Sequence, residues 1–571
     1  MKLWIDGLPV NTEPGQSLLD GVRLLGLDSE QLSLRPLAAR IAGETFTLNY
    51  IPERLSDAGP DGTVTMRRAM EASGGRVTLL RYTDRRGREV YARTMQFVLF
   101  LAVRRLWPGA VAKINFTVGD TLNVTVEKEP AFGPRDVPAL KAQMEAVVRA
   151  DIPLIRRRIS TQEAIAAFSA DGQEDKARLL AWRSVPYFDV YQYEDYMDYF
   201  YGEMAPSTGY ATVWDLVSDG GTGVQFCFPE PGNPDVPARY RELPNFTRVF
   251  AESERWCALM DCDTVADLND LVKHGRLGEL IRVNEALHER SFSQIADQIV
   301  ERKARAVLLA GPSSSGKTTS ANRLAVQLRV HGKRPVLMSL DDYYIDRDKI
   351  PPGPDGKLDL EHIDTIDTRL FRRQLTELLE GRPVNLPRFD FPTGKRVMSD
   401  KVLQLGPDSI VIIEGLHGLN PRLLPEHVES NLVFRMYVSA LLPLNLDNHN
   451  RIPTSYLRLL RRIVRDYETR NASVSHTLSM WDSVRRGEER WIFPYQENAD
   501  VIFNSSLVYE LALLKRHIFP LLDAVPPEDP WYEEVRSLVK VLNYCVAADA
   551  DEEVPPTSIL REFIGGNSFY K

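Results

Sequence analysis

Histidine is absent from the first 273 residues of the chain, since the first of the nine histidines is His274. No residue upstream of it can supply an imidazole for metal binding or acid–base catalysis. Cysteine is also scarce. The four residues Cys227, Cys257, Cys262 and Cys545 form no CxxC pair and no framework spacing, which favours a reduced, cytoplasmic protein. We expect Cys257 and Cys262 to lie in a core rather than to bind a metal.

Long hydrophobic runs are missing as well. The longest run in the first half covers residues 97–103, far short of the ~20 residues that a membrane-spanning helix needs. No charged-then-apolar signal segment opens the chain, so we expect it not to enter a membrane. The net charge of -9 argues against a nonspecific binder of nucleic acid or anionic membranes. A chain of 571 residues is too long for one core and predicts several domains.

The most informative stretch that is present runs from Gly311 to Thr318, with the sequence GPSSSGKT. It follows an apolar strand-like segment at 306–310 and opens a helical pattern that continues through Leu324. In such a P-loop, backbone N–H groups point at phosphate oxygens, Lys317 reaches the outer phosphates and the Thr318 hydroxyl can bind Mg²⁺. We therefore predict binding of a nucleoside triphosphate; the alternative is a Ser/Gly-rich turn arising by chance. The predicted nucleotide-binding residues are Gly311, Ser313, Ser314, Ser315, Gly316, Lys317, Thr318 and Thr319.

From residue 306 onward, strand and helix patterns alternate. The predicted strands are 306–310, 335–340, 409–413, 432–438 and 501–504. Near-continuous apolar strands separated by helices predict an α/β fold, in which a parallel sheet is covered by helices on both faces.

Two carboxylates follow predicted strands of this sheet. Glu414 stands at the Walker B position, where it can hold the Mg²⁺ shell directly or through water, although a helix cap is the structural alternative. Asp341 follows the second strand and can accept the proton of an acceptor hydroxyl or orient that hydroxyl in line with the γ-phosphate. We predict a magnesium site formed by Thr318, Glu414 and Asp341.

An arginine-rich helix is expected further along. Helical spacing places Arg458, Arg461, Arg462 and Arg465 on adjoining faces, one turn apart. Over a closed site they could neutralise the charge of the transferring phosphoryl group, and the alternative is a solvent-exposed basic helix.

Two patterns in the first half invite a nucleic-acid hypothesis. The tyrosine-rich run at 187–201 could stack on bases, but the acidic residues within it would repel phosphate and favour strand packing. The run 156–158 of three arginines lies in a helical pattern, which predicts a solvated helix face.

The front of the chain resembles two domains of threonyl-tRNA synthetases. The strand at residues 2–7, the Glu13-Pro14-Gly15 turn and the helix start at residues 17–19 resemble the TGS domain, a small β-grasp. Residues 97–108 and 202–209 resemble the two halves of the editing domain that follows TGS. The resemblance implies two histidines, then a cysteine and a histidine, at four positions that are here Arg93, Phe97, Phe200 and Met204. We therefore expect a catalytically silent recognition unit.

The second half resembles the uridine kinase family, within a wider group that includes phosphoribulokinase and bacterial pantothenate kinase. The shared motifs, in family order, are GPSSSGKT, SLDDYYID, LDLEHID, LPRFDFPTGKR, IIEGLHGL and RRIVRD followed by Arg470. The resemblance implies that Asp341 is the catalytic base, assisted by Lys317, and that Arg462, Arg465 and Arg470 face the phosphates. It implies that Glu361 takes the place of a ribose-binding aspartate and that Phe389, Asp390 and Phe391 line a base pocket. The residues expected at the acceptor are Tyr344, Glu361, Phe389, Phe391, Arg396 and Arg470.

Departures from that family concern the acceptor. Where uridine kinases typically carry a Tyr and a His that read the pyrimidine, this chain has Phe389 and Gly394. Glu361 has one methylene more than the ribose-binding aspartate of that family, which would shift its contact with the hydroxyl. The sequence therefore does not predict selectivity for a pyrimidine. Lys395 and Arg396 could serve an acceptor with an anionic group of its own.

Taken together, we predict an ATP-dependent, Mg²⁺-requiring kinase of a hydroxyl on a nucleoside-like small molecule. The alternatives are a kinase of another metabolite, such as a sugar phosphate, and a nucleotide-sensing switch that binds RNA or a ribosome-like partner. Homo-oligomerisation and the docking of the C-terminal segment, on the body or across a dimer, are left open. The predicted domains are 1–60 (TGS-like), 61–225 (editing-like α+β), 226–290 (linker and helices), 291–525 (P-loop kinase) and 526–571 (helical tail).

Overall fold

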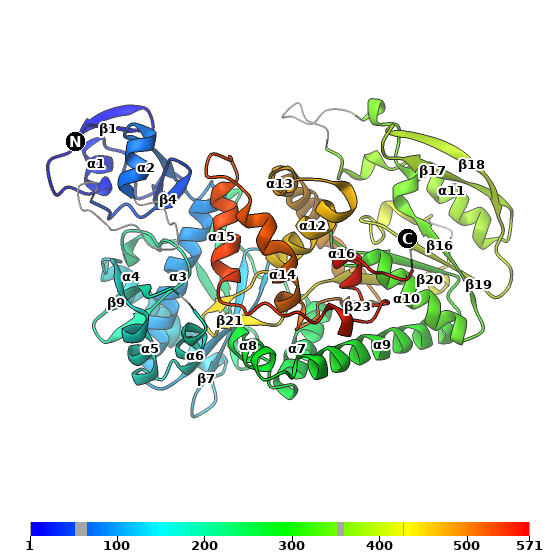
Figure 1. The fold of residues 1–571 in the computed structure, drawn as a ribbon, viewed down its shortest axis with the longest axis horizontal. Coiled ribbons are helices and arrows are strands. Elements are labelled where there is room, and N and C mark those ends of the chain that lie inside the picture. The colour runs from blue at the N-terminus through cyan, green and yellow to red at the C-terminus, as the bar shows by residue number, and fades with distance from the viewer. Residues whose placement is uncertain (1, 52–65, 184, 351–358, 426–427, 570–571) are drawn as a thin grey trace. The chain divides into compact units, whose positions relative to one another are not determined.

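The structure, a computed structural model, describes residues 2–51, 66–183, 185–350, 359–425 and 428–569 (Figure 1). It divides into two compact units. Unit 1 comprises Met1–Glu242, Thr264–Ala266 and Asn445–Arg451, and unit 2 comprises Leu243–Asp263, Asp267–Leu444 and Ile452–Lys571. The predicted boundary at residues 60–61, Leu358 of the LDLEHID motif and Tyr570 at the end of the predicted tail lie outside the described residues.

Unit 1 begins with a small five-stranded sheet of order β2-β1-β5-β3-β4. Helix α1 (Leu18–Leu24) starts where the sequence predicts, because the Ser17 side chain accepts from the Asp20 N–H and the Asp20 carboxylate accepts from the Ser17 N–H at 2.7 Å. Helix α2 (Met66–Ser73) follows. The strands are β1 (Lys2–Ile5), β2 (Leu8–Asn11), β3 (Ala38–Ile41), β4 (Glu44–Phe46) and β5 (Arg76–Leu80).

The remainder of unit 1 is an α+β arrangement around the long helix α3 (Arg85–Leu106). One sheet has the order β11-β12-β7-β6 and another the order β10-β9-β8. Their strands are β6 (Val111–Val118), β7 (Thr121–Glu127), β8 (Arg156–Ser160), β9 (Tyr187–Tyr193), β10 (Tyr196–Asp198), β11 (Asp215–Ser218) and β12 (Gly223–Cys227). The other helices are α4 (Val137–Arg149), α5 (Thr161–Ala170) and α6 (Glu174–Ala181). A short ladder of β13 (Pro229–Glu230) and β14 (Asn233–Pro237) closes the unit's main segment.

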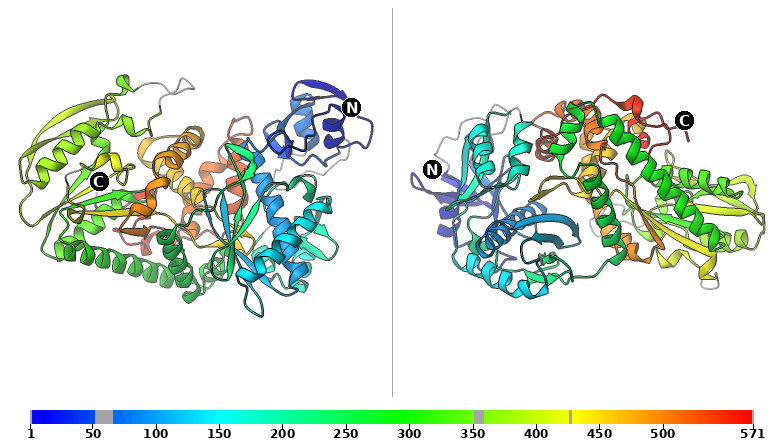
Figure 2. Two further views of the ribbon diagram at one scale, coloured as in Figure 1. Left: turned by 180° about the vertical axis from the view of Figure 1, so that it is seen from behind. Right: turned by 90° about the horizontal axis from the view of Figure 1, so that it is seen from below.

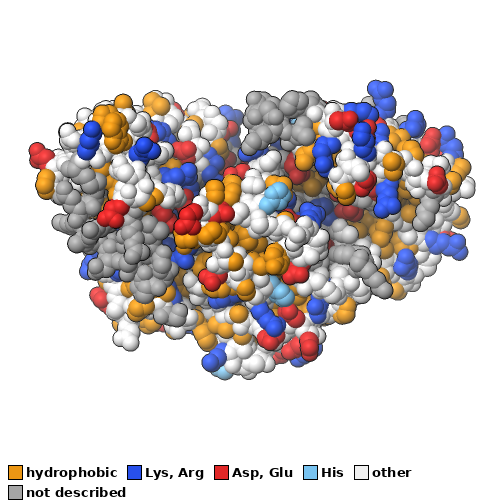
Figure 3. Space-filling view, turned by 45° about the horizontal axis from the view of Figure 1, so that its top comes forward, with side chains coloured by type: hydrophobic (Ala, Val, Ile, Leu, Met, Phe, Trp, Pro, Cys, Tyr) orange, Lys and Arg blue, Asp and Glu red, His pale blue; other side chains and the backbone are white. Residues whose placement is uncertain are grey.

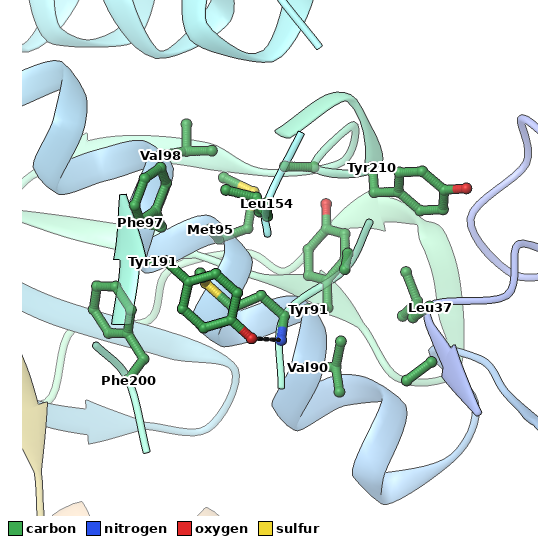
Figure 4. Packing of buried hydrophobic residues seen from close by; sticks show 14 of the residues in the cluster. Leu37, Val90, Tyr91, Met95, Phe97, Val98, Leu154, Tyr191, Phe200 and Tyr210 are labelled. Carbon is green, nitrogen blue, oxygen red and sulfur yellow. Dashed lines mark hydrogen bonds between the residues drawn. The ribbon is translucent and has the colours of Figure 1, made fainter. Parts of the chain in front are cut away.

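The core of unit 1 contains positions for which the resemblance to an editing domain predicted a loss of catalytic residues. Phe97 and Met204 are fully buried and Phe200 is nearly so, in one apolar cluster (Figure 4). The Met204 N–H donates to the Tyr191 hydroxyl at 3.3 Å, and Arg93 donates to a backbone carbonyl. These side chains pack a core and offer no nucleophile or metal ligand.

The prediction of a helix at residues 156–158 is wrong, since these arginines open strand β8. Arg158 lies opposite Asp189 on β9 and forms an ion pair with it at 2.8 Å, and Arg157 bonds to Gln192 on the same strand. Pairing with polar residues of a distant strand overrides the local helical pattern. The tyrosine-rich run forms β9 and β10, which confirms strand packing.

A hairpin from far along the chain also belongs to unit 1. It is formed by β21 (Asn445–Asp447) and β22 (Asn450–Arg451). The Asn445 side chain donates to the Ile114 carbonyl at 2.8 Å, and the His449 ring stacks on Phe100 with centroids 3.7 Å apart. Buried Asp198 accepts from both His449 and Lys176. The hairpin is thus an integral part of this unit's interior.

Unit 2 is built on a parallel sheet of order β16-β19-β15-β20-β23, which confirms the predicted α/β fold. Its strands are β15 (Ala306–Ala310), β16 (Arg334–Ser339), β19 (Ser409–Glu414), β20 (Val433–Ser439) and β23 (Val501–Asn504). Each falls within one residue of its predicted range. An antiparallel pair, β17 (Val384–Asp390) and β18 (Lys395–Leu403), stands apart from this sheet.

Helices cover both faces of the unit 2 sheet. Helices α9 (Leu277–Glu301) and α10 (Lys317–Val330) run side by side on one face, and α11 (Thr368–Leu379) packs on the other (Figures 1 and 2). Val307 and Leu309 of β15 face the first layer and Leu308 the second, as strand alternation requires. The other helices are α7 (Pro244–Leu259), α8 (Val265–Lys273), α12 (Thr454–Arg470), α13 (Val474–Trp491), α14 (Glu510–Asp523), α15 (Tyr532–Leu542) and α16 (Arg561–Ile564).

The C-terminal segment docks on unit 2, which settles part of the question left open by the sequence. Ile559 and Phe563 are fully buried in the same apolar cluster as β15 and α10.

Charges of both signs are interspersed on the face drawn in Figure 3. Within the described ranges, no helix is long and apolar enough to cross a membrane. All four cysteines are buried, and none of them is in a disulfide bond.

Candidate active site

The predicted P-loop joins β15 to α10 and has the backbone that such a loop needs. Gly316 has φ +82° immediately before the helix, and Ser314 is also left-handed at +59°. At Gly311, an added Cβ would lie 2.2 Å from the Val438 carbonyl oxygen, so only glycine allows this approach. The hydroxyls of Ser314 and Ser315 are buried, and no described residue accepts from or donates to them. Unused hydroxyls beside a helix N-terminus fit an anionic ligand.

Two buried arginines of α12 support this loop from outside the cavity described below. Arg458 forms two bonds of 2.5 and 2.7 Å with Glu488 and donates to the Ser313 carbonyl at 2.9 Å. Glu488 in turn accepts from the Ser313 N–H at 3.0 Å. Arg461 pairs with Glu510 and reaches the Ser314 carbonyl. The sequence predicted four arginines over the site, and the structure uses these two to hold the loop.

Three other arginines converge on one buried carboxylate, Asp466. Arg462 lies 3.3 Å from it, Arg465 2.7 Å and Arg470 3.3 Å. Arg462 also donates to the Ser313 hydroxyl at 2.9 Å. Burial lowers the pKa of Arg462 and of Arg470, whose guanidinium groups stay cationic near neutral pH. A single aspartate therefore gathers three positive charges beside the P-loop.

The two predicted carboxylates lie at the carboxyl edge of the sheet. Asp341 follows β16 in a short 3-10 turn, and Glu414 ends β19, directly opposite Ser339. The Ser339 hydroxyl donates to Glu414 at 2.9 Å. Burial raises the pKa of Asp341, against the opposing effect of Lys317. Burial and the charge of Asp341 raise the pKa of Glu414 to about 7.

A cavity of about 1150 Å³ brings most of the predicted residues together. Those that line it are Ser313, Ser314, Gly316, Lys317, Thr318, Asp341, Tyr344, Glu361, Phe389, Phe391, Glu414, Arg462, Arg465 and Arg470. Gly311, Ser315 and Thr319 belong to the loop and helix behind this lining. The cavity thus joins the phosphate-binding loop to the carboxylate predicted as the base.

The part of the cavity predicted to hold an acceptor is aromatic. The rings of Tyr344, Phe389 and Phe391 contact one another at centroid distances of 5.2 to 6.5 Å. Glu361 lies in the same lining, and burial, together with the charge of Glu488, raises the pKa of its carboxyl to about 7. These groups offer stacking surfaces and one polar contact to a flat ligand.

Two residues predicted at the acceptor, Asp390 and Arg396, are not in the cavity lining. Asp390 accepts from the Thr393 hydroxyl, whereas Arg396 lies on β18 and pairs with Asp367 at 3.1 Å, and Lys395 pairs with Asp348. Arg347 lines the cavity instead, and its guanidinium donates to the Phe391 carbonyl at 3.0 Å. An added Cβ at Gly394 would approach Arg347 to 3.0 Å, so glycine at this position makes room for that arginine.

Several cavity residues were not predicted from the sequence. The charged and aromatic ones among them include Arg347, Asp359, Arg486, Arg490, Trp531 and Glu562. Arg347 directly follows the SLDDYYID motif, so the motif's position was an available signal. Glu562 lies in the C-terminal tail, about 240 residues from the P-loop, and no local pattern connects the two.

The residues present fit a magnesium ion only in part. Thr318, Asp341 and Glu414 line the same cavity, and burial followed by the charge of Asp341 raises the pKa of Glu414. Across the described part of the chain, however, no group of three or more His, Cys, Asp or Glu is placed to hold a metal. Magnesium binds through one or two carboxylates together with phosphates and water. The site therefore suits Mg²⁺ that arrives with a nucleotide.

Comparison with known proteins gives two kinds of relative. A model of the phosphoribulokinase / uridine kinase family matches residues 307–511. Uridine kinase of Lactobacillus helveticus is 30% identical over 195 residues, which are 34% of this chain and 83% of that protein. Uridine kinase of Ligilactobacillus salivarius is 28% identical over 203 residues, 35% and 85% of the two chains. Threonine–tRNA ligase of Syntrophomonas wolfei is 28% identical over 152 residues, 26% and 24% of the two chains.

The family match covers the part of unit 2 that carries the P-loop, both carboxylates and the arginines gathered by Asp466. On the evidence of this match and of the L. helveticus enzyme, the chain belongs to the phosphoribulokinase / uridine kinase family.

Proposed function

We propose that this protein transfers the γ-phosphoryl group of ATP to a hydroxyl of a nucleoside or a related small molecule. Membership of the kinase family supports ATP-dependent phosphorylation of a small molecule. The observation that carries the proposal is that Lys317 and Asp341 line one cavity, large enough for both substrates. The nucleoside is proposed because several relatives are named uridine kinases.

In the proposed reaction, the amides at the start of α10 bind the phosphates and Lys317 contacts the outer ones. Asp341 takes the proton of the acceptor hydroxyl while the oxygen of that hydroxyl forms a bond to the γ-phosphorus. The bond from that phosphorus to the bridging oxygen breaks, and ADP leaves. Arg462 and Arg465 offset the charge that spreads over the transferring group. Bound Mg²⁺, held by Thr318 with Glu414 and Asp341, would supply further charge neutralisation.

The lining of the acceptor subsite supports a flat molecule as acceptor, and it also favours a second candidate for the acceptor. The three aromatic rings suit a base, but Phe389 and Gly394 offer no polar side chain to a pyrimidine edge. Arg347 in the lining favours, as second candidate, an acceptor that carries its own phosphate, such as a sugar phosphate. Because positions 389 and 394 offer no polar side chain to read the edge of a base, we expect broad tolerance within nucleosides.

The test is ADP release from ATP and Mg²⁺ with a panel of nucleosides and sugar phosphates. Lys317→Ala and Asp341→Asn should each lower kcat by at least about 100-fold. Lys333→Ala, a change at an ion pair with Asp408 outside the lining, serves as the matched control. No acceptor-dependent ADP release above that of Lys317→Ala would refute the proposal. Activity on sugar phosphates alone would select the second candidate.

For unit 1 we propose a TGS-like module followed by an editing-like domain without catalysis. The similarity to a threonine–tRNA ligase and the apolar side chains at positions 97, 200 and 204 support this reading. The same similarity motivates the other candidate, a nucleotide-dependent switch that binds structured RNA. Salt-sensitive co-purification of RNA would favour the switch, whereas an RNA-free preparation with full turnover would count against it.

A further inference from the structure

The C-terminal tail places a carboxylate on the helix that follows the P-loop. Glu562 Oε2 accepts from the Thr319 N–H at 3.2 Å and from the Thr319 hydroxyl at 2.7 Å. Glu562 also lines the cavity that contains Lys317. Its charge is among the causes that raise the pKa of Glu414, so its negative charge is felt within the site.

The amide that Glu562 occupies is one that a phosphate would use. Helix α10 begins at Lys317, so the Thr319 N–H belongs to the first turn, whose amides have no partner within the helix. Such amides and the helix dipole bind anions, and a P-loop directs them at phosphate oxygens. A carboxylate and a phosphate oxygen cannot both take this donor in the same geometry.

The tail is held firmly at this place. Ile559 is fully buried, and a Cβ added to Gly316 would lie 2.5 Å from its Cγ2. Phe563 is also fully buried, with the Arg461 guanidinium 5.0 Å from its ring centre. Asn567 donates to the Thr319 hydroxyl at 3.3 Å. Packing on both sides of Glu562 therefore keeps its carboxylate concentrated at the helix start.

We propose that Glu562 is an internal competitor of the nucleotide phosphates and so sets the affinity of the kinase for its donor. A bound polyphosphate takes the Thr319 amide, and the Glu562 side chain turns away from it while Ile559 and Phe563 stay packed. This inference rests on the proposed function, because it assumes that the P-loop binds a nucleotide. The inference gives the C-terminal tail a role in donor binding, although the tail lies outside all of the kinase motifs.

The experiment compares three variants by titration calorimetry with ATP and, separately, with tripolyphosphate, which lacks base and sugar. Glu562→Gln removes the charge at constant size, and Glu562→Ala also removes the acceptor. Glu552→Gln, an exposed acid of the same tail outside the lining, is the matched control. Thermal unfolding of each variant accompanies the titrations, and the isosteric glutamine variant carries the test if the alanine variant fails to fold.

We expect the affinity for both ligands to be lowest in the wild type, higher in Glu562→Gln and highest in Glu562→Ala. The expected gain in affinity is about 2- to 30-fold, the range that one anion at a helix N-terminus is worth. Glu552→Gln should match the wild type. In the wild type, tripolyphosphate should also raise hydrogen exchange of amides in residues 561–567, because the bonds between Glu562 and Thr319 that help to hold this segment are lost.

Three results would overturn the inference. Unchanged or weaker tripolyphosphate binding by Glu562→Gln would show that the carboxylate does not compete with phosphate. Weaker ATP binding with unchanged tripolyphosphate binding would place Glu562 against the nucleoside part of the donor. If none of the variants, nor the wild type, binds either ligand, the proposed function falls together with the inference, whereas the first two results leave the proposed function standing.

Discussion

The buried pair of Glu488 and Arg458 allows a sharp test of how the P-loop is held. Both side chains are almost fully buried, and Glu488 also accepts from the Ser313 N–H. Glu488→Ala leaves the Arg458 charge inside the protein and removes the acceptor of the loop amide. Removing one partner of a buried ion pair costs about 3–5 kcal/mol, so the variant should unfold at clearly lower urea concentration and bind ATP poorly.

The neighbouring residue provides the control. Glu489 is exposed and pairs with Arg485, so Glu489→Ala should change the free energy of unfolding by less than about 0.5 kcal/mol. Urea titrations followed by tryptophan fluorescence report on this region, because buried Trp481 lies 5.5 Å from the Arg458 guanidinium. A second variant, Arg458→Met combined with Glu488→Leu, should lose less stability than Glu488→Ala alone, since it leaves no unpaired charge.

Equal losses for Glu488→Ala and Glu489→Ala would refute this reasoning. So would a double variant whose loss of stability equals the sum of the losses of Arg458→Met and Glu488→Leu measured singly, because the energetic coupling between the two side chains would then be zero. ATP affinity separates the two roles of Glu488. If stability falls and ATP binding by the folded fraction is normal, the pair stabilises unit 2 but does not shape the P-loop.

Three further outcomes are expected. The pKa of Glu361 is raised to about 7 by burial and by the charges of Glu488 and Asp341, although Arg462 and Lys317 lower it. Its carboxylate therefore forms only as the pH rises through 7. The acceptor KM should therefore increase below pH 7, and Glu361→Gln should abolish that dependence. Gly487→Ala places a Cβ 2.3 Å from that of Glu361 and should raise the acceptor KM several-fold with little change in the KM for ATP, whereas Gly406→Ala, whose nearest neighbour is 3.7 Å away, should be neutral. His449→Ala removes the stacking on Phe100 and a partner of buried Asp198, and should lower thermal stability by about 1–3 kcal/mol, while the exposed His274→Ala should not.

The sheet of unit 2 and the positions of its kinase motifs could be predicted from the sequence because their signals are local. Strand β15, the loop from Gly311 and the start of α10 follow one another without interruption, and each has its own residue pattern. Asp341 and Glu414 come directly after apolar strands, so a parallel sheet necessarily brings them to one edge. Their place in the cavity follows from topology, whereas their roles in catalysis remain predictions.

The contacts that were not predicted join residues far apart in the sequence. A helical pattern shows that Arg458 and Arg461 lie near Arg462, but not which of them meet Glu488 or Glu510. Arg156 to Arg158 form a strand because β9 supplies their partners, and no window around them contains that information.

Glu562 shows the same limit at the site itself. In the sequence it is one acid among 79 acidic residues, in a tail with no motif. Its position at Thr319 depends on Ile559 and Phe563 filling gaps beside α10, so apolar packing and not charge selects which carboxylate reaches the helix start. A kinase motif specifies where phosphate binds, but the strength of that binding also depends on whatever else the fold brings to the same amides. The donor affinity of this chain is therefore a property of the whole of unit 2, and variation in a distant tail can change it without altering any residue of the P-loop.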